Sequence, residues 1–378
     1  MSIINYVTQI QFDFGASSLL QQECDRLGIR HPMVVTDVGV RAAGIVDHVL
    51  KHLRNPDPAV YDQTPPNPNE AAVRQASAQY REGGFDGLIA IGGGSSIDLA
   101  KGVAICGTHE GPMRSFAVIE GGVERITAAT APVIAIPTTA GTGSEVGRGA
   151  ILILEDGRKV GLLSPHLVPK SAICDPELTL GLPAKMTAAT GMDALSHCLE
   201  TFMSAAFNPP ADGIALDGLR RGWLNIEQAT RNPGDREARM NMMSASMQGA
   251  MAFQKGLGCV HSLSHSLGGI DPRLHHGTLN AIFLPAVIAF NSSCDSIKQE
   301  QKLERIAQTM QLGGPDEIGP AIKEMSKRLD LPVGLAELGL SRELFPQIIK
   351  GALADHTHKT NPRIASKKDY QWMLEQSL

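Results

Sequence analysis

Aromatic side chains are scarce in this sequence of 378 residues, at 4% of the total. Leu, Val, Ile, Ala and Met must therefore supply most of the core, and a hydrophobic fraction of 43% is ample for that. No apolar run reaches the roughly 18 residues that would predict a membrane-spanning helix. There is also no block of like charge, since 34 basic and 39 acidic residues are interspersed. Nucleic acid and anionic membranes are therefore poor candidates as partners.

The sequence also lacks any CxxC pair. Its six cysteines fall mostly in apolar runs, as reduced buried thiols do: Cys24, Cys106, Cys174, Cys198, Cys259 and Cys294. The first residues lack the basic stretch followed by an apolar one that marks a secretory signal. We therefore predict a soluble protein of the cytoplasm.

The length favours two domains over one core. The first half alternates short β-branched runs with helical patterns, which is typical of βαβ units. Strands are predicted over residues 32–37, 86–91, 132–137 and 150–155, with a helix over 96–105. Beyond about residue 182, amphipathic helical patterns such as 236–254 take over. The prediction is a dinucleotide-binding α/β domain over 1–182 and an all-helical domain over 183–378, which carries the metal and substrate.

Two segments of the first half indicate nucleotide binding. Gly92, Gly93, Gly94 and Ser95 follow a predicted strand and open a helix. Glycines there let backbone N–H groups approach a pyrophosphate, and the helix N-terminus adds partial positive charge. The spacing is not GxGxxG, so the ordinary Rossmann fingerprint is absent. A second loop, 138–144, offers small hydroxyl residues that can bond phosphate and carboxamide groups.

Asp37 ends the predicted strand over 32–37. A carboxylate at that place can accept hydrogen bonds from adenosine ribose hydroxyls, and it would repel a 2′-phosphate. This favours NAD over NADP as the cofactor. The alternative is an acid that merely caps the turn after the strand.

The second half contains a group of residues suited to a metal ion. Asp193 and His197 are four residues apart, so on a helix they share one face. With His261 and His276 they offer one carboxylate and three imidazoles, which suit Fe²⁺ or Zn²⁺. A metal and a dinucleotide together suggest redox chemistry on an alcohol or carbonyl. The alternatives are an intrahelical hydrogen bond for Asp193 and His197, and ordinary core histidines.

Two neighbouring histidines need separate roles. His275 and His276 are adjacent and cannot easily serve one site, and we favour His276 because it precedes Gly277 and a new helical pattern. His265 lies four residues beyond His261 on the same helical face. It is predicted to take part in proton transfer rather than in metal binding.

Together these segments resemble the iron-dependent, group III alcohol dehydrogenase family along essentially the whole chain. The motifs that carry the resemblance are Gly92-Gly93-Gly94-Ser95, Ile136-Pro137-Thr138-Thr139, Gly141-Thr142-Gly143-Ser144-Glu145, Asp175-Pro176, Leu182-Pro183, Gly191-Met192-Asp193-Ala194 through His197, Gly256-Leu257-Gly258 through His261, and His276-Gly277. Several uncommon motifs in one order make a chance match implausible.

The resemblance implies a fold shared with the dehydroquinate synthases and specific roles for residues. The metal ligands would be Asp193, His197, His261 and His276. His265 would lie near the nicotinamide. The cofactor would contact Asp37, Asn67, Gly93, Gly94, Ser95, Thr138, Thr139, Thr142, Ser144 and Lys159. The expected reaction is reversible hydride transfer between an alcohol carbon and NAD, with the metal ion acting as a Lewis acid.

The segment before the third predicted ligand departs from many family members, because 253–258 is one residue shorter and contains a lysine. The stretches 249–258 and 355–362 most resemble the 4-hydroxybutyrate dehydrogenase branch. A carboxylate-bearing substrate needs a cation, for which Lys255 and Arg148 are the candidates. The alternative is that both are solvated surface charges.

Other activities stay open at this stage. Within the oxidoreductases they include other primary alcohols, polyols and maleylacetate. A lyase of the dehydroquinate synthase type, which turns over without net redox change, is the alternative from another class. A binding protein that has lost its activity is a third. A homodimer or a larger homo-oligomer is expected, with an edge strand over 5–12 that could pair across a dimer.

Overall fold

The computed structural model describes residues 8–55 and 57–378, and they form two compact units. The α/β unit takes the described residues up to 139 together with 144–180. The helical unit takes 140–143 and everything from Gly181 onward. The short loop 140–143 thus belongs with the helices although the residues on both sides of it belong to the α/β unit.

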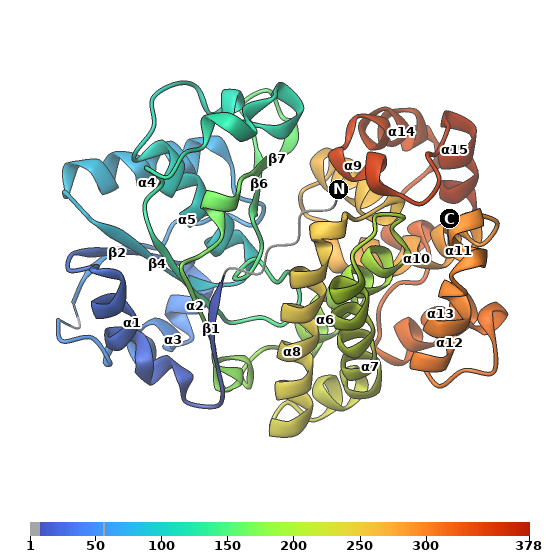
Figure 1. The fold of residues 1–378 in the computed structure, drawn as a ribbon, viewed down its shortest axis with the longest axis horizontal. Helices are drawn as coiled ribbons and strands as arrows, with labels where there is room; N and C mark the ends of the chain where they lie inside the picture. Colours follow the sequence, from blue (N-terminus) through green and yellow to red (C-terminus); the bar gives the residue numbers. More distant parts are fainter. Residues whose placement is uncertain (1–7, 56) are drawn as a thin grey trace. The chain divides into compact units, whose positions relative to one another are not determined.

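The α/β unit is built on a six-stranded parallel sheet with the strand order β1-β8-β5-β4-β2-β3 (Figure 1). The strands are β1 (Gln9–Phe12), β2 (Pro32–Val35), β3 (Ala59–Tyr61), β4 (Gly87–Gly92), β5 (Val133–Pro137) and β8 (Ser171–Cys174). Each predicted strand over 32–37, 86–91 and 132–137 is present. The parallel α/β sheet that the sequence predicts is confirmed.

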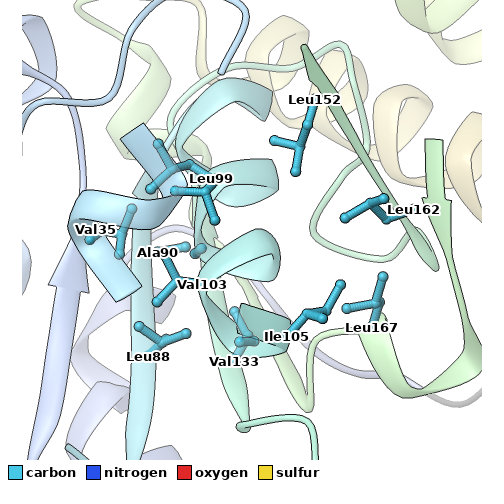
Figure 2. Packing of buried hydrophobic residues seen from close by; sticks show 14 of the residues in the cluster. Val35, Leu88, Ala90, Leu99, Val103, Ile105, Val133, Leu152, Leu162 and Leu167 are labelled. Atoms are coloured by element: carbon cyan, nitrogen blue, oxygen red, sulfur yellow. The ribbon is translucent and has the colours of Figure 1, made fainter. Parts of the chain in front are cut away.

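Alternating side chains of the strands enter two cores, one on each face of the sheet. Leu88, Ala90 and Val133 pack on one face with α4 (Glu70–Glu82) and α5 (Gly94–Cys106). Figure 2 shows this packing, in which Leu99 and Val103 of α5 lie over the strands.

The opposite face is covered by α1 (Leu20–Leu27) and α3 (Ile45–Leu50), which pack on Ile89, Ile91 and Ile134. Because strands buried on both faces have no polar side to present, they read in the sequence as continuous apolar runs.

The predicted strand over 150–155 is present, but it does not join the parallel sheet. β6 (Gly149–Ile153) pairs with β7 (Lys159–Leu163) as an antiparallel hairpin. Asp156 and Gly157 form its turn, and Gly157 has a φ of +81°, a conformation that glycine adopts without strain. Leu152 and Leu162 of the hairpin belong to the same core as α5 and lie beside that helix (Figure 2).

The helical unit contains no regular strand within the described residues, as the sequence predicts. Its α-helices are α6 (Ala184–Met203), α7 (Pro209–Arg231), α8 (Arg236–Ala252), α9 (Cys259–Ile270), α10 (His276–Asn291), α11 (Asp295–Gln299), α12 (Lys302–Thr309), α13 (Ile318–Arg328), α14 (Phe345–Ala354) and α15 (Lys367–Gln376). Among the helices described, none has the length and apolar character needed to span a membrane.

Helix α6 is the centre of this unit. It packs against α7, α8 and α10 (Figure 1), and 17 of its 20 residues, from Thr187 to Met203, are buried. The start of α10 approaches α6 closely, because a Cβ placed on Gly277 would lie 2.0 Å from the Ala189 carbonyl oxygen. Glycine at this position lets His276 reach the face of α6 that carries Asp193.

The predicted edge strand over 5–12 is described only in part, since 1–7 lie outside the described residues. β1 takes the edge position next to β8. Pairing of this edge across a dimer stays a prediction.

Candidate metal and cofactor site

One face of α6 presents three buried acid or imidazole side chains. Asp193, His197 and Glu200 lie at positions i, i+4 and i+7, which a helix stacks on one side. Their exposed fractions are 3%, 4% and 2%. Buried groups of this kind need partners, so neighbouring helices must supply them.

Three imidazoles converge on one oxygen of Asp193. Its Oδ1 lies 3.7 Å from Nε2 of His197, 3.8 Å from Nε2 of His261 and 3.6 Å from Nε2 of His276. For Asp193, His197 and His261 the available ligand atoms all lie within 4.8 Å of one another. These spacings suit atoms that share one ion, since zinc-ligand bonds of about 2.1 Å place tetrahedral ligands about 3.4 Å apart.

The His261 imidazole is held from behind by Glu200. Nδ1 of His261 lies 2.5 Å from Oε2 of Glu200, and the backbone N–H groups of Val260 and His261 donate to this carboxylate. When Glu200 is ionised it only accepts hydrogen bonds, so Nδ1 then carries the proton and the lone pair of the ring lies on Nε2, the atom that faces Asp193. Burial raises the pKa of Glu200 to about 7 and lowers the pKa of His261 well below its ordinary value.

Asn280 completes the surroundings of the ligand atoms. Its Nδ2 donates to Oδ1 of Asp193 at 2.7 Å and lies 3.2 Å from Nε2 of His276, four residues earlier on α10. Its Oδ1 is buried and has no hydrogen-bond partner among the described residues, and the same holds for Nδ1 of His197. Unsatisfied buried polar atoms around a nitrogen and oxygen donor set are what a site for a divalent ion would leave in the bare chain.

His265, the residue predicted for proton transfer, lies beside this group without belonging to it. Its ring centroid is 5.3 Å from that of His276 and 5.7 Å from that of His261. Nδ1 bonds Oδ2 of Asp355 at 3.0 Å. Burial alone would raise the pKa of Asp355, but the imidazole of His265 and its hydrogen bond hold that pKa below its ordinary value.

The neighbouring His275 takes a different position from His276. It is the N-cap residue of α10, and its Nδ1 is buried with no hydrogen-bond partner among the residues described. Burial lowers its pKa. The ion-pair contact to Asp193 comes from His276.

Six of the predicted nucleotide residues follow the carboxyl ends of neighbouring strands, β2, β4 and β5, of the parallel sheet: Asp37, Gly93, Gly94, Ser95, Thr138 and Thr139. β4 runs into Gly93 and Gly94, and α5 begins there with no side chain capping its N-terminus. Its first N–H groups are therefore donors available to a phosphate. A Cβ on Gly93 would lie 3.4 Å from the side chain of Thr139, so the glycine turn lies beside the residues that follow β5.

Asp37 follows β2, the strand beside β4. Its Oδ1 accepts from the N–H of Val40 at 3.0 Å and caps α2 (Val38–Ala42), and its Oδ2 accepts from Ser96 Oγ at 3.2 Å. The chain adds β3 on one side of β2 and β4 on the other, so β2 and β4 flank the point where the strand order reverses. In open parallel sheets, ligands bind at such a point.

The buried ammonium group of Lys101 holds the loop after β5 in place. Thr138 N–H donates to Gly92 O at 3.0 Å, which ties this loop to the glycine turn. Ser144 Oγ donates to Asp98, and Nζ of Lys101 donates to the carbonyls of Ser144, Gly147 and Gly149 at 2.7–2.8 Å. The hydroxyl of Ser144 is therefore engaged inside the α/β unit.

Asn67 and Lys159, far apart in the chain, are brought together. Nζ of Lys159, at the start of β7, donates to Oδ1 of Asn67 at 2.9 Å. Asn67 has a φ of +54°, an uncommon conformation outside glycine that asparagine tolerates best. Thr142 belongs to the short loop that lies with the helical unit.

The two cations proposed for a substrate carboxylate differ in their surroundings. Lys255, at the end of the 3₁₀ helix Phe253–Lys255, is buried, and its ammonium pairs with Asp212 of α7. Burial lowers its pKa. Arg148 is exposed, just before β6. The ammonium of Lys255 thus already has a carboxylate partner within the chain.

Comparison with known proteins identifies the family. The profile described as iron-containing alcohol dehydrogenase matches residues 7–176, and the profile for the C-terminal region of the same family matches residues 187–378. This chain belongs to the iron-containing alcohol dehydrogenase family. The candidate nucleotide loops lie in the first of these regions, and the four candidate metal ligands lie in the second.

Individual members of the iron-containing alcohol dehydrogenase family are similar over the full length. A 4-hydroxybutyrate dehydrogenase from Cupriavidus necator is 61% identical, with both chains covered completely. A crystal structure of a 1,3-propanediol oxidoreductase is 34% identical with a TM-score of 0.92, both chains again being covered. A sulfoacetaldehyde reductase from Bifidobacterium kashiwanohense, solved with NAD⁺, is 25% identical with a TM-score of 0.89 and covers 100% of this chain and 98% of its own. The chain is an alcohol dehydrogenase of this family.

Several residues of the site were not predicted from the sequence. Glu200 could have been found, because it follows Asp193 by seven residues and so shares its helical face. Asn280 could also have been found, because it follows His276 by four residues on α10. Asp355 and Lys101 gave no such signal, since their partners lie 90 and 43 residues away.

Proposed function

We propose that this alcohol dehydrogenase interconverts 4-hydroxybutyrate and succinate semialdehyde with NAD. The observation that carries the proposal is the 61% identity, over all of both chains, to a 4-hydroxybutyrate dehydrogenase. The 1,3-propanediol dehydrogenases from Klebsiella pneumoniae and Citrobacter freundii stand at 35% and 36%. A diol lacks the carboxylate, so the two substrate classes differ in one feature that kinetics can isolate.

We propose Fe²⁺ as the native ion, held by Asp193, His197, His261 and His276. One anionic and three neutral ligands leave a divalent ion with excess positive charge, and nitrogen-rich sets of this kind also accept Zn²⁺. Such an ion would supply Lewis acidity toward the substrate oxygen. The ligands themselves supply geometry, because buried helices hold them before any ion arrives.

For NAD we propose the residues at the carboxyl ends of the central strands. Gly93, Gly94 and Ser95 would offer backbone N–H groups to the pyrophosphate. Asp37 would accept from the ribose hydroxyls and disfavour a 2′-phosphate. The remaining proposed contacts are Asn67, Thr138, Thr139, Thr142, Ser144 and Lys159.

His265 is proposed to accept the proton of the substrate hydroxyl. It is 7% exposed, and its ring stacks on that of His276 with an interplanar angle of 12°. Oxidation of an alcohol releases a hydride and a proton, and only the hydride goes to NAD. A nearby imidazole with a free lone pair is the usual recipient of the other.

For the substrate carboxylate we propose Arg148, with Lys255 as the second candidate. Arg148 is exposed, and a guanidinium can bind a carboxylate through two hydrogen bonds. Lys255 is paired with Asp212, so a substrate anion would have to compete with that acid. Arg148→Met and Lys255→Met should be compared on 4-hydroxybutyrate and on 1-butanol. A loss on the acid of no more than about threefold relative to 1-butanol in both variants contradicts the anchor, because a charged contact contributes at least ~1.5 kcal/mol.

The test of the function itself is an activity screen of anaerobically purified protein. Apoprotein is loaded with Fe²⁺ or Zn²⁺ and given NAD or NADP with 4-hydroxybutyrate, 1,3-propanediol, glycerol or 1-butanol. We expect the highest kcat/KM for NADH formation with 4-hydroxybutyrate and NAD. A preference for 1,3-propanediol contradicts the substrate, and a protein that forms no NADH from any alcohol contradicts the function.

A further inference from the structure

Asp355 and His265 form a buried pair beside the candidate metal ligands. Asp355 is the residue directly after α14, and its Oδ2 lies 3.0 Å from Nδ1 of His265 on α9. The side chains of both residues are 8% exposed. An ionised carboxylate only accepts hydrogen bonds, so Nδ1 of His265 must be the protonated ring nitrogen.

The ring of His265 has little freedom to turn. It stacks on His276, with centroids 5.3 Å apart and planes 12° apart. It also stacks on His356, with centroids 5.9 Å apart and planes 19° apart. Two neighbouring rings that are nearly parallel to it restrict the plane of the His265 ring, and the contact of Nδ1 with Asp355 then decides which nitrogen bears the proton.

The carboxylate of Asp355 is itself anchored. Its Oδ1 accepts from the backbone N–H of Thr357 at 2.8 Å and from Thr357 Oγ1 at 2.5 Å. Thr357 Oγ1 also lies 2.9 Å from Oγ of Ser262, on the same helix as His265. One oxygen is thus bound within the 3₁₀ helix His356–Thr360, and the other is left for the imidazole.

We propose that Asp355 is a positioning residue that holds His265 as the Nδ1–H tautomer, so that the Nε2 lone pair is kept for the substrate hydroxyl. Among the described residues, none hydrogen-bonds Nε2 of His265. The substrate is the partner that this atom lacks. The inference rests on the proposed function, and it assigns Asp355 a role that was not predicted from the sequence.

The pair repeats a relation found one turn earlier on the same helix. His261 and His265 are four residues apart on α9, and Nδ1 of each bonds a buried carboxylate, Glu200 in the first case and Asp355 in the second. Both imidazoles therefore present Nε2 for chemistry. In the first ring this atom lies 3.8 Å from Oδ1 of Asp193, and in the second it has no hydrogen-bond partner among the residues described.

The test compares Asp355→Asn with Asp316→Asn. Asparagine keeps the size of the side chain but can turn its NH₂ toward Nδ1 and so favour the Nε2–H tautomer. In Zn²⁺-loaded protein labelled with ¹⁵N-histidine, NMR should show Nδ1–H for His265 in the wild type and its loss in Asp355→Asn. We expect kcat with 4-hydroxybutyrate to fall on the order of 10²-fold, as for loss of a general base, while KM changes less than about threefold.

Asp316→Asn is the matched control, because it makes the same change from acid to amide at an exposed position of the helical unit. It should keep the Nδ1–H signal and a kcat within about threefold of wild type. Zinc content and melting temperature, measured for both variants, report any general damage to the fold.

The inference is overturned if wild-type His265 carries its proton on Nε2, or if Asp355→Asn retains wild-type kcat. A merely structural role for Asp355 would lower the melting temperature or zinc content without changing the tautomer, and that result also overturns it. The NMR signal does not depend on turnover. Absence of alcohol oxidation by the wild type would therefore contradict the proposed function alone.

Discussion

The Nδ1 atom of His261 lies 2.5 Å from Oε2 of Glu200, within the buried interior of the helical unit. The two residues are 61 positions apart, and Glu200 also accepts from the N–H groups at the start of α9. A carboxylate behind a ligating imidazole fixes its tautomer and raises its basicity. Glu200 therefore does two things at once: it caps α9 and aims His261 at Asp193.

Substitution of Glu200 should weaken metal binding. Glu200→Gln is expected to lower the affinity for Zn²⁺ or Fe²⁺ by about 10- to 100-fold, because an amide polarises the Nδ1–H of His261 less and presents N–H groups to the start of α9. Competition with a chromophoric chelator measures the affinity directly. Glu237→Gln, an exposed change on α8, is the control and should leave the affinity unchanged. Equal affinities in both variants would contradict the role of Glu200.

The adjacent histidines 275 and 276 provide a test of the ligand set. His276→Ala should lose at least about 100-fold in metal affinity, because Nε2 of His276 lies 3.6 Å from Oδ1 of Asp193. His275→Ala should bind metal as the wild type does, because His275 makes no such contact with Asp193. Addition of excess Zn²⁺ should then raise the melting temperature of His275→Ala but not of His276→Ala, because a ligand stabilises only the state that binds it. The reverse pattern would assign the ligand to His275.

Cofactor choice should depend on the charge of Asp37. Asp37→Asn keeps an oxygen to cap α2 but removes the negative charge, so the ratio of kcat/KM for NADP to that for NAD should rise at least tenfold. Asp37→Ala should show the same change in ratio with an additional loss of about 1 kcal/mol in stability, because the cap is gone. Steady-state kinetics and denaturant unfolding separate the two effects. An unchanged ratio would mean that Asp37 is only a helix cap.

The buried ammonium of Lys101 should be essential for the loop after β5. Lys101→Met removes the donor to three backbone carbonyls and leaves Asp98 without its nearest cation, so a loss of about 3–5 kcal/mol in the free energy of unfolding is expected. Lys170→Met, an exposed change in the same unit, should stay within about 0.5 kcal/mol of wild type. Urea unfolding followed by circular dichroism measures both. Similar midpoints for the two variants would show that the loop is held by other contacts.

The hairpin β6–β7 illustrates where local pattern stops being informative. Its first strand and its Asp156-Gly157 turn were readable, because alternation and turn chemistry are local properties. The sequence did not predict that the hairpin leaves the parallel sheet and packs on α5. Leu152 and Leu162 are also residues that a buried parallel strand commonly contains. Their position is decided by packing in the core that they share with Leu99 and Val103 of α5.

The sequence by itself determined the helical phase of α6, and with it the shared face of Asp193 and His197, because a spacing of four residues is fixed by the geometry of the helix. It also determined the glycine turn after β4, where Gly92 has a φ of +154° and a Cβ would lie 2.5 Å from Oγ of Ser96. Only the tertiary structure decided that His261 and His276 meet Asp193, and that Glu200 and Asp355 stand behind two imidazoles of α9. These contacts depend on which helices pack together and on how far each helix is shifted along its neighbour. The volumes of many buried side chains set that packing, and no local spacing in the sequence does.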